Sequence, residues 1–170
     1  MYAGTRALDD EGNVTMRAIQ DFYPTEFAHC YGCGPQNPVG HHLKSYLVGN
    51  RTIARYSPDA AYCGGMPGHV YGGMIASLID CHGTASAAAF CYLHEQRTMG
   101  DGLAPIRFVT ASLKVDFKHP TPLGVELVVE GRLRSIEGRK AWIDLSLTAD
   151  ERPCAIGEML AIRLPDRTDI

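Results

Sequence analysis

The stretch of sequence that decides the fold is Tyr71-Gly72-Gly73-Met74-Ile75-Ala76-Ser77-Leu78-Ile79-Asp80. It passes from two glycines into a helix-forming segment, and we expect a helix from about Gly72 to about Glu95. At about 100° per residue, Asp80 shares one narrow face with small residues, whereas large apolar side chains cover the broad opposite face. This helix is therefore expected to bury its broad side and to keep a smooth wall around Asp80.

Asp80 is the main candidate for a functional residue. It lies about two turns inside the predicted helix, where Asp neither caps a helix nor favours one. A solvent-facing Asp80 is the alternative interpretation. A solvated face usually carries Lys and Glu, however, and no other Asp, Glu, Lys or Arg occurs between Tyr71 and Tyr92. A lone carboxylate among small residues indicates a site.

Length and composition favour one ordinary globular domain. The chain has 170 residues, 45% of them hydrophobic and 21% charged, with a net charge of -3. We expect a loosely held arm over residues 1–24 and a single domain over residues 25–170. The charge gives no basic field for nucleic acid. No apolar run reaches the roughly 18 residues that span a bilayer, and the first residues are too acidic for a signal peptide. We expect a cytoplasmic protein that binds neither nucleic acid nor membrane.

Alternating apolar residues on both sides of the helix predict an antiparallel sheet. Two short strands, over 43–48 and 52–56, flank a Gly49-Asn50 turn. After the helix, a period of two recurs in four segments up to Leu164, joined by short connections. This order predicts a meander of neighbouring strands with one apolar face. Only the helix can cover that face, so we expect an α+β fold in which a curved antiparallel sheet wraps a long central helix.

These features occur in a recognisable order. A loop reads Cys30-Tyr31-Gly32-Cys33-Gly34 and continues to Asn37-Pro38; two strands follow, and Gly72-Gly73 then opens a helix with an acid seven residues after the second glycine. This order resembles the hotdog-fold acyl-CoA thioesterases over about residues 25–164. It is most similar to the phenylacetate-pathway type, whose relatives include 4-hydroxybenzoyl-CoA thioesterases. The family pattern is His-Gly-Gly, four residues, Leu, any residue and Asp, and Tyr71 stands where the family usually has His.

The resemblance implies an activity, a substrate and a set of roles. Asp80 would be the catalytic carboxylate that activates a water or attacks the thioester, and the Gly72 N–H would bind the thioester carbonyl. Thr84 would help to hold the water or the acid. The substrate would be an acyl-CoA, the protein a homodimer or homotetramer with sites between paired helices, and no cofactor is expected. Further residues expected to contact substrate are Tyr71, Gly73, His69 and Ser77.

Such a small set of polar groups suits thioester hydrolysis. A helix N-terminus offers free N–H donors and a positive dipole end to the oxyanion that forms. Losing one oxyanion donor typically costs about 2.7 to 4 kcal/mol of transition-state stabilisation. The leaving thiolate, judged by a cysteine pKa of about 8.5, departs without a general acid. The alternative function is a hotdog module that binds an acyl group or CoA without hydrolysis, because Tyr71 replaces the usual His.

Cys30 and Cys33 form a Cys-x-x-Cys pair, a spacing that also occurs in zinc sites. Neither a second Cys-x-x-Cys nor a His-x-x-x-His completes a ligand set. We therefore expect a tight turn packed against the sheet, and no metal. The six cysteines are expected to be reduced, with Cys81, Cys91 and Cys154 as small core residues. The further ligands that a zinc site would need are His29, His41, His42, Cys63 and His69.

Three further polar residues, His82, Ser77 and His69, are also candidates for a functional site. His82 falls on the apolar side of the helix, which predicts a hydrogen-bonded core histidine. Ser77 shares the face of Asp80 but lacks a histidine base and a Gly-x-Ser-x-Gly motif, so we do not expect a nucleophilic serine. His69 either replaces the missing family histidine or is a plain loop residue. The candidates for binding the CoA phosphates are Arg97, Arg107 and Lys114.

Overall fold

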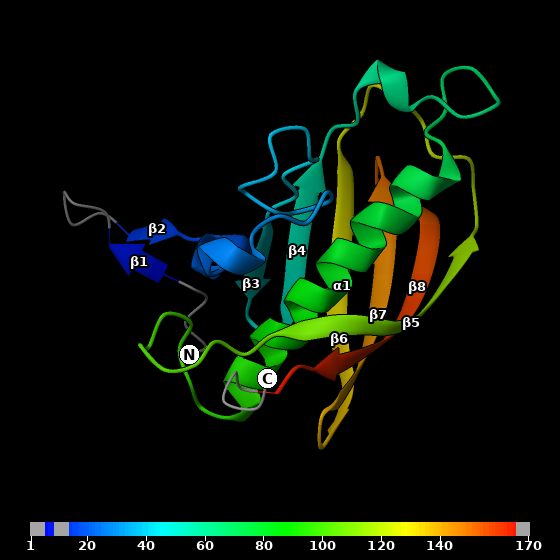
Figure 1. The fold of residues 1–170 in the computed structure, drawn as a ribbon. Coiled ribbons are helices and arrows are strands. Elements are labelled where there is room, and N and C mark those ends of the chain that lie inside the picture. The colour runs from blue at the N-terminus through cyan, green and yellow to red at the C-terminus, as the bar shows by residue number, and fades with distance from the viewer. Residues whose placement is uncertain (1–5, 9–13, 166–170) are drawn as a thin grey trace.

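The computed structural model describes residues 6–8 and 14–165, and its main elements are one long helix and one large sheet (Figure 1). The helix, α1, spans Gly72–His94. The strands of the sheet are β3 (Ser45–Val48), β4 (Arg51–Tyr56), β5 (Phe108–Phe117), β6 (Leu127–Glu137), β7 (Lys140–Ala149) and β8 (Arg152–Arg163). Three short 3-10 helices are η1 (Ile19–Phe22), η2 (Thr25–Phe27) and η3 (Ala60–Tyr62). The predicted helix and strand segments are thus confirmed to within a few residues.

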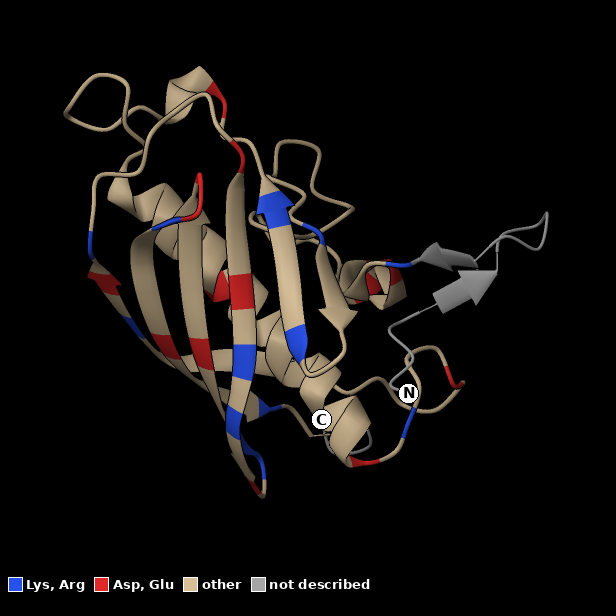
Figure 2. Cartoon of the chain, turned by 180° about the vertical axis from the view of Figure 1, so that it is seen from behind, with Lys and Arg blue, Asp and Glu red and all other residues tan. Residues whose placement is uncertain are grey.

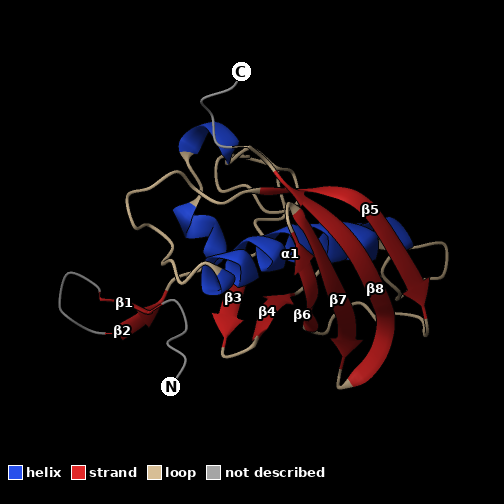
Figure 3. Ribbon diagram, turned by 90° about the horizontal axis from the view of Figure 1, so that it is seen from below, coloured by secondary structure: helices blue, strands red, loops and turns tan. Residues whose placement is uncertain are grey.

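The sheet curves around α1, which contacts all six of its strands (Figure 3). Met74, Leu78 and Ile79 on the broad apolar face of α1 are fully buried against the sheet. Basic and acidic residues are interspersed along the strands of the sheet (Figure 2). Arg134 on β6, for example, pairs with Asp144 on β7 and with Glu158 on β8, the next strand but one. One face of the sheet is therefore core and the other is solvated, and the predicted α+β hotdog fold is confirmed.

The strand order corrects the predicted meander. The order is β3-β4-β6-β7-β8-β5, so β5 pairs with β8 and not with β6, its successor in sequence. The link between β5 and β6 contains Pro120 and Pro122, and it is held against the loop before α1 by a hydrogen bond from the Val70 N–H to the Thr121 carbonyl (2.8 Å). The link therefore crosses the end of the fold where α1 begins, instead of forming a hairpin between β5 and β6. As a result, β5 is an edge strand.

The core begins before the predicted boundary at residue 24. Ala18, Ile19 and Gln20 are buried, and Ile19 belongs to the main core. The Gln20 side chain accepts a hydrogen bond from the Ser45 N–H (2.8 Å), which ties η1 to β3. Ahead of this point, β1 (Arg6–Leu8) pairs with β2 (Val14–Met16) in a small separate sheet. Residues 18–20, which the sequence assigns to the arm, therefore pack with the domain.

The helix α1 has the length and mean hydropathy that a membrane span would need, in contrast to the expectation from sequence. However, 78% of its most apolar window is buried inside the protein. Since every strand of the sheet contacts it, α1 is the core helix of this fold.

Candidate functional site

Asp80 lies partly buried on α1 and lines a cavity of about 340 Å³. The walls come from α1, from the start of β5, and from the segment around η2 and the cysteine loop. Most of the wall is apolar, and its apolar members include Phe27, Ala88, Ile106, Phe108, Val109 and Leu164. A carboxylate at the edge of an apolar cavity of this size is typical of a small-molecule site.

Thr110 on β5 holds the Asp80 carboxylate. Its hydroxyl donates a hydrogen bond of 2.6 Å to Oδ1 of Asp80. The sequence pattern missed this residue because it placed Val109 and Ala111 on the inner face of β5. The pairing of β5 with β8 shifts register between Thr110 and Ser112. Because of this irregularity, the side chains in the first half of the strand face the opposite side of the sheet from the one that simple alternation predicts.

The exposure of side chains along β5 agrees with this reversal. Val109 is 44% exposed and Ala111 is exposed, whereas Phe108 and Thr110 are partly buried. Beyond the irregularity, Leu113 and Val115 are partly buried, as the pattern predicts. A bulge leaves no clear mark in a pattern of period two, so the sequence carried no signal for Thr110.

Thr84 lines the same cavity as Asp80, one turn further along α1. Its hydroxyl donates to the carbonyl of Cys81 (3.1 Å) and, more weakly, to that of Asp80 (3.4 Å). Such back-bonding is common for Thr within helices. Thr84 is thus close to the predicted catalytic acid, but Thr110 is the residue that contacts the carboxylate.

The N-terminus of α1 opens on a second cavity of about 310 Å³, which Gly72 lines together with Phe117 and the link after β5. Tyr71 is the N-cap residue, makes no side-chain cap, and stacks on Tyr62 with ring centroids 6.4 Å apart. A Cβ at Gly73 would collide with the Tyr71 ring. Gly73, the second glycine of the pair, therefore allows the exposed Tyr71 side chain to fold back over the start of the helix.

Within one chain, Gly72 and Asp80 do not share a cavity. Eight residues of helix separate them by about 12 Å along the axis. A thioester carbonyl must lie within about 3 Å of its oxyanion donor. Within one chain, the Gly72 N–H and the Asp80 carboxylate are therefore too far apart to contact the same carbonyl group.

Neither His69 nor Ser77 is among the residues that line the cavity of Asp80. The His69 Nδ1 lies 3.1 Å from the Pro67 carbonyl, and its backbone forms a β-bridge with Pro122. Ser77 is partly buried against the cysteine loop, with its hydroxyl oxygen 3.3 Å from the position of a Cβ on Gly32. His69 is thus nearer to the helix N-terminus, and Ser77 to the cysteines.

Three cysteines meet beside Asp80. The Sγ atoms of Cys30, Cys33 and Cys81 all lie within 4.8 Å of one another, and those of Cys30 and Cys81 are 3.6 Å apart. The Cys33 and Cys81 thiols donate hydrogen bonds that lower the pKa of Cys30. The same contacts with Cys30 raise the pKa of Cys81 and raise that of Cys33 to about 12. The predicted tight turn is present, but Cys81, assigned from sequence to the core, completes a cluster of three thiols.

His82 is a core histidine, as predicted. It is fully buried, and its two ring nitrogens contact the hydroxyls of Ser45 (2.9 Å) and Thr52 (3.1 Å). Burial lowers its pKa to about 4. These contacts explain how a polar ring is accommodated between α1 and the first two strands of the sheet.

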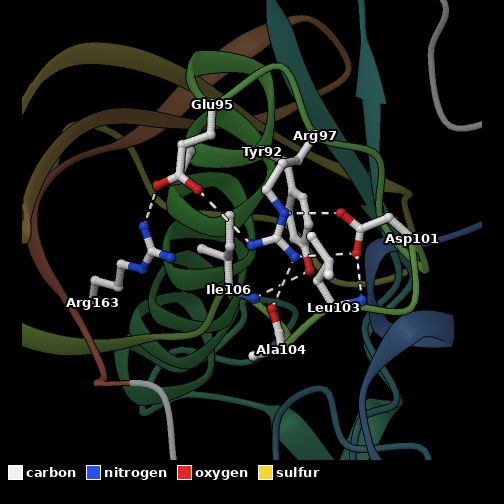
Figure 4. Close-up of polar contacts among 9 residues, drawn as sticks. Tyr92, Glu95, Arg97, Asp101, Leu103, Ala104, Ile106 and Arg163 are labelled. Carbon is white, nitrogen blue, oxygen red and sulfur yellow. Dashed lines mark hydrogen bonds and ion pairs between the residues drawn. The ribbon is translucent and has the colours of Figure 1, made fainter.

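The C-terminal end of α1 fixes the segment that leads into β5 (Figure 4). Arg97 binds the Asp101 carboxylate (2.8 Å) and the Ala104 carbonyl (2.9 Å), and the Ile106 N–H donates to the Tyr92 hydroxyl (3.1 Å). Arg97, one of the candidates for binding the CoA phosphates, therefore has a structural role in this segment.

Of the other two basic candidates for CoA phosphates, Lys114 pairs with Asp116 (3.3 Å). Arg107 lines the cavity of Asp80, with its guanidinium 3.5 Å from the centroid of the Phe27 ring.

Comparisons with known proteins point to one family. Residues 67–156 match the model of the thioesterase superfamily. A thioesterase superfamily protein from Shewanella loihica, of known crystal structure, is 39% identical, with a TM-score of 0.63 over 84% of this chain and 100% of that one. The PaaI protein of the E. coli phenylacetic acid degradation operon is 16% identical, with a TM-score of 0.53 over 69% of this chain and 75% of that one. This last likeness concerns the fold alone.

Among characterised sequences, the acyl-coenzyme A thioesterase THEM4 of Rattus norvegicus is 38% identical over 89 residues. The match covers 52% of this chain and 32% of the rat protein. The chain therefore spans about a third of the length of that relative.

Proposed function

Since the chain belongs to the thioesterase superfamily, we propose that it hydrolyses an acyl-CoA thioester to a free acid and CoA. The observation that carries the proposal is the Asp80 carboxylate, held by Thr110 at the edge of an apolar cavity of about 340 Å³. The cavity accommodates an acyl group and the carboxylate supplies the reactive oxygen. The likeness to an acyl-coenzyme A thioesterase supports CoA as the leaving group.

Asp80 acts as general base or as nucleophile. As a base, it takes a proton from the water whose oxygen bonds to the carbonyl carbon, and the C–S bond then breaks as CoA leaves as a thiolate. As a nucleophile, its oxygen bonds to the carbonyl carbon, the C–S bond breaks as CoA leaves as a thiolate, and water then hydrolyses the resulting anhydride and restores the carboxylate. Thr110 is a positioning residue in both cases, because it binds Oδ1 and leaves Oδ2 for the reaction.

The Gly72 N–H serves as the oxyanion donor at the positive end of α1. Because Gly72 and Asp80 of one chain lie about 12 Å apart along the helix, the donor for each site comes from the other subunit of a homodimer. Two α1 helices packed antiparallel would bring Gly72 of each subunit towards the carboxylate of the other. The catalytic unit is then a symmetric dimer with two composite sites.

The edge strand β5 supports this assembly. Among the strands that the structure describes, it pairs with β8 alone, and its exposed side chains include Val109 (44%) and Phe117 (55%). Val109 lines the cavity of Asp80, and Phe117 lines the cavity of Gly72. A two-fold axis near the centre of β5 would place the start of one strand beside the end of its partner. This pairing joins the Asp80 cavity of one subunit to the Gly72 cavity of the other.

A thiol-release screen with aromatic and aliphatic acyl-CoAs tests the proposal. We expect turnover with at least one substrate, and Asp80→Asn should abolish most of it. The matched control is Asp144→Asn, which makes the same change on the outer face of the sheet. Undiminished turnover in Asp80→Asn would remove Asp80 from the mechanism. Tight binding of acyl-CoA without thiol release across the panel would favour the non-hydrolytic acyl-binding module instead.

A further inference from the structure

Three thiols from two distant segments converge beside the cavity of Asp80. Cys30 and Cys33 come from the loop before β3, and Cys81 comes from α1. Their Sγ atoms all lie within 4.8 Å of one another. Cys33 and Cys81 are buried, whereas Cys30 is exposed. All three line the cavity of Asp80, so one side of the cluster is open.

The backbone of the loop is shaped around these sulfurs. A Cβ on Gly32 would collide with the Sγ of Cys81, so only glycine at this position lets the sulfur approach the loop. A Cβ on Gly34 would collide with the backbone of Ala28 and Cys30. The Gly34 N–H donates to the Cys30 carbonyl (2.8 Å), which closes the turn between the two cysteines. The turn is thus packed so that its two thiols face the third.

The spacing of the sulfurs fits a tetrahedral metal ion. Zinc binds Cys sulfur at about 2.3 Å, so two sulfurs on one tetrahedral zinc lie about 3.8 Å apart. The Sγ atoms of Cys30 and Cys81 are 3.6 Å apart. Three thiolates with a Cys-x-x-Cys pair are a ligand set that zinc favours over harder metals such as magnesium.

We propose that Cys30, Cys33 and Cys81 bind one Zn²⁺ ion through their Sγ atoms. The fourth coordination position faces the cavity beside Asp80. The ion ties the cysteine loop to α1, and the three thiolates outweigh its charge, so the occupied cluster carries a net charge of about -1. The thiol protons pass to solvent on binding, so the affinity rises with pH. This site does not depend on the proposed hydrolysis, and it revises the expectation of no metal because Cys81 supplies the ligand that the sequence pattern lacked.

Cobalt substitution tests the proposal on the full chain, kept reduced with a non-thiol reductant after removal of metals. Adding Co²⁺ should produce a thiolate-to-cobalt charge-transfer band and the strong visible bands of tetrahedral cobalt, both saturating at one equivalent. Zn²⁺ should then displace the cobalt and bleach these bands. Zn²⁺ should also raise the Tm, because it binds the folded state.

Matched variants separate this cluster from other cysteines. Cys81→Ser should lose the charge-transfer band, whereas Cys91→Ser, at another buried cysteine of α1, should keep it. Cys30→Ser provides a second variant, since Cys30 is exposed and its replacement leaves the core intact; Cys63→Ser is its exposed control. Absence of the band in the reduced wild-type protein would overturn the proposal. So would a band of equal intensity in Cys30→Ser.

Discussion

Thr110 on the edge strand β5 donates a hydrogen bond of 2.6 Å to the carboxylate of Asp80 on α1, 30 residues away in sequence. This contact crosses from the sheet to the helix at the edge of the apolar cavity. It fixes the orientation of the carboxylate that we propose to be catalytic.

Replacing Thr110 with Val should lower kcat/KM by about tenfold to a hundredfold, because a hydrogen bond to a charged group contributes about 1.5 to 3 kcal/mol. Val keeps the shape of the side chain but removes the hydroxyl. Thr110→Ser, which keeps a hydroxyl, should recover much of the activity. Equal steady-state rates for wild type and Thr110→Val would show that the contact has no part in the reaction.

Replacing Gly72 with Pro should lower kcat by about a hundredfold to a thousandfold, because it removes the N–H proposed as the oxyanion donor. Pro is tolerated at the first position of a helix, and Tyr71 before it already has the extended backbone that Pro requires (φ -71, ψ 147). Gly72→Ala is the control, since it keeps the N–H and adds a Cβ 3.3 Å from the Phe117 ring. If both variants lose the same activity, crowding and not the donor is responsible.

Mixing two inactive variants should restore activity if the site is shared between subunits. A dimer of one Asp80→Asn chain and one Gly72→Pro chain has one intact composite site and one doubly altered site. Random exchange of subunits should therefore give about a quarter of the wild-type rate. The measurement is thiol release after co-expression of the two chains. A mixture as inactive as its parents would place both groups of each site in the same chain.

Stability should decrease between pH 6.5 and pH 4 because of His82. Burial lowers its pKa from 6.5 to about 4, so the folded state keeps the ring neutral while the unfolded state takes up a proton. The contribution is complete above pH 6.5 and is lost as the pH falls towards 4, by about 3 kcal/mol in total. The groups that contact the ring are the hydroxyls of Ser45 and Thr52.

Urea unfolding across this pH range measures the effect of His82. The variant His82→Gln, which cannot take up a proton, should have a free energy of unfolding that changes less with pH than that of the wild type. Because carboxylates titrate equally in both proteins, the difference between the two curves isolates the histidine. Parallel curves would contradict the prediction.

Local patterns were sufficient to predict the helix, the strand segments and the layer architecture. The apolar face of α1 and the alternating apolar residues of β6, β7 and β8 each predict which side chains are buried. The position of β5 was not predictable in this way, because the link through Pro120 and Pro122 resembles a short hairpin connection but crosses the fold. Strand pairing is a long-range property that no local window contains.

The site was predictable only where its residues are close in sequence. Gly72, Asp80 and Thr84 are positions on one helix; the sequence pattern points to Asp80, and the family resemblance adds Gly72 and Thr84 as candidates. Thr110 depends on an irregularity in β5, and the contact of Cys81 with the cysteine loop depends on how that loop folds against α1. Both residues come near Asp80 through tertiary packing.

The register shift between Thr110 and Ser112 divides β5 into a first part that lines the cavity and a second part that packs on the core. Val109 and Thr110 border the cavity, Phe108 both borders it and packs on the core, and Leu113 and Val115 pack on the core alone. Substitutions at Val109 and Thr110 should therefore change the shape of the cavity with little effect on the core. Among relatives, sequence differences in the first part should accompany differences in substrate preference. Sequence differences in the second part should accompany differences in thermal stability.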